Sequence, residues 1–167
     1  EAFHPRFDNN IGSPYRSASG RPGHSYWQNA ASYDLKVRLD DQANRVSGQA
    51  SITYTNNSPD ALDFIWLQLD QNLFEPNSVG QAVVPLSNSR YGSAGNDFKG
   101  GYEIASVAIN GQNDTQYTIN DTRMRVDFSK ALAANGGKTT LTIEYAYNIP
   151  KYGADRTGIL ETKQGNI

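Results

Sequence analysis

Apolar and polar residues alternate along much of the chain, which is the pattern of strands that are buried on one face. The first alternating run spans residues 33–39. Its apolar face consists of Tyr33, Leu35, Val37 and Leu39. Turn-forming residues follow at 40–45, and residues 46–55 repeat the alternation. The two runs therefore predict an antiparallel hairpin with a half-buried first strand.

Residues 62–69 show a different pattern, because they are apolar on both faces. One face consists of Leu62, Phe64 and Trp66, and the other of Ile65, Leu67 and Leu69. A strand that is apolar on both sides is typical of the interior of a sheet. The pattern predicts a central, covered strand with Trp66 in the core.

The following part of the chain predicts a second hairpin. Residues 102–109 alternate and end at Asn110-Gly111, which is the strongest short hairpin signal. We expect them to pair with the run around Tyr117 and Ile119. Between the third strand and this hairpin, residues 75–101 are rich in Gly, Ser and Asn, and they predict a long loop that is either functional or flexible.

The last third of the chain predicts two more strands and one short helical turn. Residues 124–128 alternate, and Ser129 is then expected to cap a single helical turn that ends at Gly136-Gly137. Residues 141–147 form the last clear strand, and Pro150 ends it because proline cannot donate a hydrogen bond to a ladder.

Together these patterns predict an all-β fold, an antiparallel sandwich or a bent, saddle-like sheet with about seven main strands and very little helix. The predicted organisation has three parts. Residues 1–32 form an irregular N-terminal segment that packs on the sheet, residues 33–150 form the antiparallel β domain, and residues 151–167 form a tail.

Composition and charge exclude several classes of function. The chain has 167 residues, 37% of them hydrophobic, which suffices for one self-supporting core. There are no cysteines, so disulfides and cysteine-ligated zinc sites are excluded. A net charge of −2 gives no basic field for a phosphate backbone, so we expect no nucleic-acid partner. The longest apolar stretch, residues 64–67, is far too short for a membrane span.

Metal-binding motifs are weak in this sequence. The two histidines, His4 and His24, lack the helical spacing that zinc proteases use. Asp40, Asp41 and Asn44 have the oxygen chemistry of a calcium site, but adjacent Asp residues between two strands are far more often turn formers. We therefore expect neither a metal ligand nor a cofactor in this chain.

The residue types offer candidates for two other kinds of site. Glu103 and Glu144 are a possible carboxylate pair for glycoside hydrolysis, although any β protein offers such pairs on solvated faces. Trp27 and Trp66 are candidates for a sugar-stacking platform, with packing against the sheet as the simpler role for each. The residues alone thus indicate a β domain without catalytic residues.

Several ordered segments nevertheless resemble the N-terminal β domain of bacterial aminopeptidase N-like zinc metallopeptidases, the gluzincin family that includes leukotriene hydrolases. The resemblance covers residues 26–167. Its segments are Tyr26-Trp27-Gln28-Asn29, Tyr33-Asp34-Leu35, residues 48–59, residues 65–72, Thr122-Arg123-Met124, Ile149-Pro150, Gly153 and Asp155-Arg156. Better-known members often have His after the Leu of the third strand, whereas this chain has Leu67-Gln68, which indicates a divergent bacterial branch.

The resemblance implies a function that this chain does not perform alone. In that family a His-Glu-x-x-His helix and a further Glu hold the zinc in the following domain, so zinc is expected there and no catalytic or metal residue here. The N-terminal domain walls the cleft and helps to position the amino terminus of the peptide substrate. Its substrate-gripping glutamine is expected just beyond Ile167, and Gln164 is not a substitute.

The resemblance also implies where the chain meets its neighbours. Tyr152, Asp155 and Arg156 in the tail are candidates to face the domain interface or the cleft. The expected partners are the following catalytic domain of the same polypeptide and, in the full-length protein, a peptide substrate. The expected location is periplasmic or extracellular.

Two alternative functions remain open from the sequence. One is a stand-alone β-sandwich that binds glycans or a protein partner through the 75–101 loop and exposed tyrosines. The other is a structural domain in a catalytically inactive relative of the peptidases.

Overall fold

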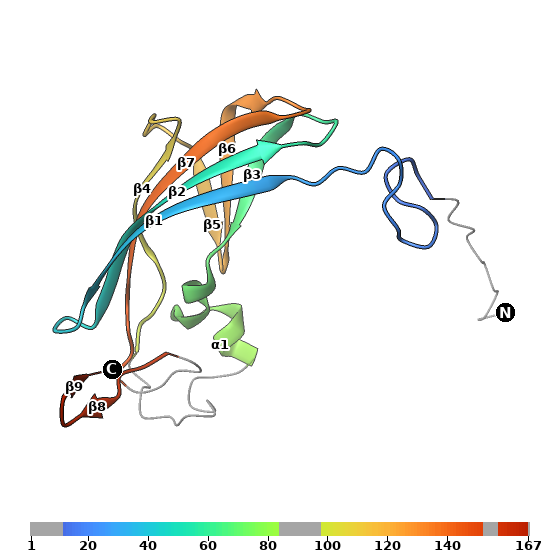
Figure 1. Ribbon diagram of the computed structural model, residues 1–167. Helices are drawn as coiled ribbons and strands as arrows, with labels where there is room; N and C mark the ends of the chain where they lie inside the picture. The colour runs from blue at the N-terminus through green and yellow to red at the C-terminus, as the bar shows by residue number, and fades with distance from the viewer. Residues whose placement is uncertain (1–11, 84–97, 152–156, 167) are drawn as a thin grey trace.

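The computed structural model describes residues 12–83, 98–151 and 157–166, and these form two main antiparallel sheets, one two-stranded hairpin and little helix (Figure 1). The larger sheet has the strand order β1-β2-β7-β4, and the smaller sheet has the order β3-β6-β5. The predicted all-β class is confirmed.

The larger sheet begins with the hairpin that the alternation predicts. β1 (Ala30–Asp40) pairs with β2 (Arg45–Asn56) along its whole length, from Ala30 opposite Thr55 to Asp40 opposite Arg45. β2 pairs in turn with β7 (Gly137–Asn148), and β7 pairs with β4 (Glu103–Ile109). β1 and β4 are therefore the two edges of this sheet among the described residues.

The prediction of a central third strand is wrong, because this strand lies at the edge of the smaller sheet. β3 (Leu62–Gln68) pairs with β6 (Arg123–Leu132), which pairs with β5 (Tyr117–Asn120). β3 is thus an edge strand and not a central one, and Trp66 is 56% exposed. Its inward residues Ile65 and Leu67 pack against the core, whereas Phe64 on its outer face is 37% exposed.

The expected hairpin at Asn110-Gly111 is also wrong, although the turn itself forms. Both residues have positive φ, as this tight turn requires, and the Ile109 N–H donates to the Gln112 carbonyl at 3.0 Å. The turn is bound to β7, because Asn110 Oδ1 accepts the Thr140 N–H at 2.9 Å. The chain then crosses to the other sheet, so β4 and β5 do not pair.

The helical turn expected after Ser129 is absent, because β6 continues as a strand through Leu132, which pairs with Leu62. A tight turn follows, with Asn135 and Gly136 at positive φ.

The helices that the structure does describe are η1 (Asp70–Phe74) and α1 (Val79–Val83), both between β3 and β4. A short hairpin of β8 (Glu161–Thr162) and β9 (Gly165–Asn166) lies in the tail.

The core lies between the two sheets. Met124, Val126 and Leu141 are fully buried at its centre, and Ile143 and Val107 lie beside them. No helix among the described residues has the length and apolar character needed to span a membrane.

Two buried asparagines connect the loops around this core. Asn56, at the end of β2, donates from Nδ2 to the carbonyls of Asp60 and Ala133, while its Oδ1 accepts from the N–H and hydroxyl of Ser58. Asn72 in η1 donates to the Asp121 carbonyl and accepts the Tyr102 N–H. Each side chain supplies hydrogen-bond partners to backbone groups that would otherwise need water as a partner.

Candidate interaction surface

An apolar stripe of exposed side chains follows β1. The stripe consists of Tyr33, Leu35, Val37 and Leu39, whose exposed fractions range from 57% to 63%. These residues share a face with Ile52 and Ala50, their neighbours on β2, because directly opposed residues in a sheet point the same way. Ile52 is only 9% exposed. The smaller sheet therefore covers the central part of this inward face and leaves the part formed by β1 exposed to solvent.

The stripe continues across the sheet toward β7 through a close approach at Gly48. Val37 pairs with Gly48, and Gly48 pairs with Tyr145. A Cβ on Gly48 would lie 3.0 Å from the Tyr145 hydroxyl and 2.8 Å from the Lys36 carbonyl oxygen. Glycine is thus the residue that lets the Tyr145 ring lie over β2, beside the stripe.

A cluster of three tyrosines borders the stripe. The ring of Tyr102 meets those of Tyr145 and Tyr147 edge to face, with centroids 5.6 Å and 5.5 Å apart. Burial is the largest of the effects that raise the pKa of Tyr102 to about 12, and the nearby Tyr147, Tyr145 and Asp70 contribute in the same direction. Burial likewise raises the pKa of Tyr147. The cluster thus favours the neutral form of the Tyr102 and Tyr147 phenols.

We expect this cluster to make the fold sensitive to alkali. Because the folded state holds the pKa of Tyr102 at about 12 rather than 10.0, its contribution to stability is complete below pH 10 and is lost as the pH rises toward 12. Tyr102→Phe should reduce this alkaline loss, measured by urea unfolding at several pH values. Tyr33→Phe, which removes an exposed phenol, is the control. An equal alkaline loss in wild type and Tyr102→Phe would contradict the assignment.

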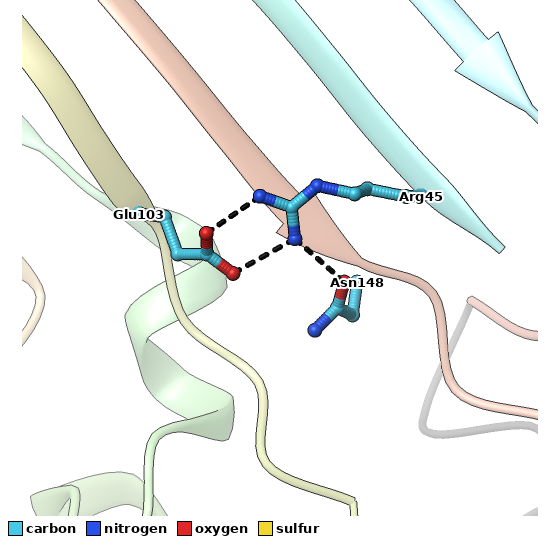
Figure 2. Close-up of polar contacts among 3 residues, drawn as sticks. All are labelled: Arg45, Glu103 and Asn148. Carbon is cyan, nitrogen blue, oxygen red and sulfur yellow. Dashed lines mark hydrogen bonds and ion pairs between the residues drawn. The ribbon is translucent and has the colours of Figure 1, made fainter. Parts of the chain in front are cut away.

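The opposite, outer face of the larger sheet holds a polar cluster where β2 begins and β7 ends (Figure 2). Arg45 on β2 donates to both carboxylate oxygens of Glu103 on β4 and to Asn148 Oδ1 on β7, the last at 2.8 Å. The hydrogen bonds from Arg45 lower the pKa of Glu103, and those same bonds raise the pKa of Arg45. The cluster joins β2 to β4 across the strand between them.

This geometry argues against glycoside hydrolysis by Glu103 and Glu144. Both residues line one open groove on the outer face, so the structure does bring them together. Glu103, however, is engaged by the Arg45 guanidinium, and its pKa moves down, whereas a general acid needs a raised pKa. Glu144 accepts a hydrogen bond from Gln49 at 3.3 Å.

The residues considered for metal binding form a turn. Asp40 Oδ1 accepts the N–H groups of Gln42 and Ala43, and Asn44 has a φ of 51°, as turn positions require. Within residues 12–83, 98–151 and 157–166, no group of three or more His, Cys, Asp or Glu side chains has the arrangement of a metal site. The cleft candidates Tyr152, Asp155 and Arg156 lie outside the described residues.

The two tryptophans are both at the surface. Trp27 is 39% exposed in the segment before β1, and Trp66 lies on the outer face of β3. Trp66 contacts Phe64 edge to face, and the Arg125 guanidinium stacks on the Phe64 ring at 3.9 Å. Asp127 holds Arg125 in place with an oxygen 2.7 Å from its Nε. Sequence reasoning placed Trp66 in the core, and its doubly apolar strand gave no signal of this exposed position.

Comparisons with known proteins found similarity at the level of structure. No family model and no curated protein matches the sequence. The M1 zinc metallopeptidase from Deinococcus radiodurans superposes with a TM-score of 0.45 at 16% sequence identity, over 70% of this chain and 19% of that one. A mutant of a two-domain M1 zinc metallopeptidase bound to L-arginine gives the same TM-score, identity and coverage. The chain spans about a fifth of the length of these structures, and similarity at this level does not assign it to their family.

Proposed function

We propose that this chain is a non-catalytic N-terminal β domain of a zinc-dependent aminopeptidase. In this proposal it walls one side of the cleft and helps to position the amino terminus of the peptide. The observation that carries the proposal is the apolar stripe on β1, because contiguous exposed apolar surface marks a protein interaction site. The sequence segments that resemble aminopeptidase N-like enzymes suggest that the covering neighbour is the following peptidase domain.

The proposed role is steric and positional. The described residues offer no side-chain group that fits a zinc ion, so the proposal assigns zinc to the following domain and routes no chemical step through this one. A rigid wall restricts how far a peptide enters a cleft, and orientation of this kind contributes substantially to catalysis. On the same resemblance we propose a periplasmic or extracellular location.

The test uses the longer protein that contains this chain. We expect a His-Glu-x-x-His helix within the few hundred residues after Ile167 and aminopeptidase activity that a chelator abolishes. The double variant Leu35→Lys with Val37→Lys should lower that activity, because it places charges in the covered stripe. Lys36→Ala with Arg38→Ala, on the other face of the same strand, is the matched control. Absence of the helix, or equal activity in both double variants, would refute the proposal.

A second candidate function is glycan binding at the Phe64–Trp66 pair. Exposed aromatic rings beside hydrogen-bonding charged groups are suited to stack on sugars, and Arg125 and Asp127 lie next to this pair. Oligosaccharides should then quench tryptophan fluorescence in Trp27→Phe, which leaves Trp66 as the reporter, and not in Trp66→Phe. Equal quenching in both variants, or none in either, would exclude this site.

A further inference from the structure

The edge of β1 offers a second means of association, separate from its exposed face. β1 is the first strand of its sheet, and among the described residues it pairs with β2 alone. Figure 1 shows its long outer edge at the margin of the sheet. The strand has 11 residues, so its outer edge presents a long row of backbone N–H and C=O groups. Such an edge is a template for another strand.

We propose that two copies of this chain pair through β1, antiparallel and centred on Leu35. The bounds of the strand, Ala30 and Asp40, place Leu35 at its midpoint. Pairing about Leu35 therefore overlaps the whole strand with its counterpart. The contact is isologous, because the same edge serves both copies, and it closes as a two-fold dimer.

The charges of β1 select this register. With Leu35 opposite itself, Asp34 lies opposite Lys36 of the second copy, and by symmetry this pair occurs twice. Arg38 lies opposite Ser32, so no like charges are opposed. Moving the centre to Lys36 also opposes Asp34 to Arg38 twice, but it places Lys36 opposite itself. Moving the centre to Asp34 places Asp34 opposite itself. Opposed unlike charges stabilise an antiparallel pair and opposed like charges destabilise it.

The apolar side chains agree with the same register. Tyr33 lies opposite Val37 of the second copy, and Leu35 lies opposite its own counterpart. Aromatic and β-branched neighbours are favourable cross-strand pairs. Because the pairing joins odd positions with odd positions, the stripes of both copies lie on one face and become continuous. Charged residues on an edge ordinarily oppose strand addition, but here their alternating signs are self-complementary.

This inference does not rest on the proposed function. A following domain would cover the face of β1, whereas a second copy pairs with its edge. Failure of the dimer would leave the proposed function intact, and loss of the proposed function would leave the dimer intact.

Sedimentation velocity at increasing protein concentration tests the dimer. We expect the wild-type chain to show a monomer–dimer equilibrium. Lys36→Asp should raise the dimer dissociation constant at least about tenfold, because it turns both pairs with Asp34 repulsive. Arg38→Asp makes the same charge change on the same exposed face, but opposite Ser32, and should change the constant by less than about threefold. Circular dichroism verifies that both variants remain folded.

A charge-exchange experiment separates strand pairing from other kinds of association. Asp34→Lys alone should also weaken the dimer, because lysines then oppose lysines. An equimolar mixture of Asp34→Lys and Lys36→Asp should form a heterodimer, because two lysines of one copy face two aspartates of the other. A wild-type chain that stays monomeric would overturn the proposal. So would equal weakening by Lys36→Asp and Arg38→Asp, or a mixture that does not associate.

Discussion

Replacing Asn56 by alanine is expected to destabilise the domain by about 3 kcal/mol. The Asn56 side chain is fully buried and makes four hydrogen bonds, to Asp60, to Ala133 and two to Ser58. The substitution leaves the Ala133 carbonyl and the Ser58 N–H without this partner, while the Ser58 hydroxyl can still donate to the Asp60 carbonyl at 2.9 Å. Urea unfolding measured by circular dichroism gives the change in the free energy of unfolding.

The adjacent asparagine provides a matched control. Asn57 is exposed and donates from Nδ2 to the Gln28 carbonyl at 2.9 Å. Water replaces that hydrogen bond when the side chain is removed, so Asn57→Ala should cost less than about 1 kcal/mol. If both variants lose the same stability, the burial of Asn56 has no energetic importance and the assignment is wrong.

Truncation of Leu141 should have an effect of similar size by a different mechanism. Leu141 is fully buried between Ile52 on β2 and Ile109 on β4. Leu141→Ala removes apolar contacts and leaves a cavity, which together should cost about 3–4 kcal/mol. The same unfolding experiment measures it.

Leu35→Ala tests whether the stripe is open in the isolated chain. Leu35 is the same residue type on the same face of the sheet, but 57% exposed. At concentrations where the chain is monomeric, its truncation should change stability by less than about 0.5 kcal/mol. A loss comparable with that of Leu141→Ala would show that another part of the chain covers β1.

Periodicity predicts which face of a strand is apolar, but not whether a second layer covers it. The alternation of residues 33–39 correctly assigned the faces of β1. Their exposure follows from the width of the smaller sheet, which packs on β2, β7 and β4 and stops short of β1. That width is a tertiary property, so the sequence predicted the residues of the candidate surface without predicting that they would be open.

Strand order was harder to predict than strand position, because turn chemistry is local. Asn110-Gly111 forms the expected tight turn, yet Asn110 Oδ1 accepts the Thr140 N–H of β7. The chain then crosses to the smaller sheet instead of pairing back with β4. In β3, a doubly apolar pattern indicated a central strand. The outward aromatic residues instead pack with each other and beneath Arg125, which a pattern of apolar and polar positions does not reveal.

The buried position of Met124 has a chemical consequence for the folded molecule. It is the single methionine of the chain and has no solvent-exposed surface. Oxidants convert a thioether to the sulfoxide only where they can reach the sulfur. Peroxide can therefore oxidise Met124 only when the two sheets separate. A chain that carries methionine sulfoxide at this position has opened at least once.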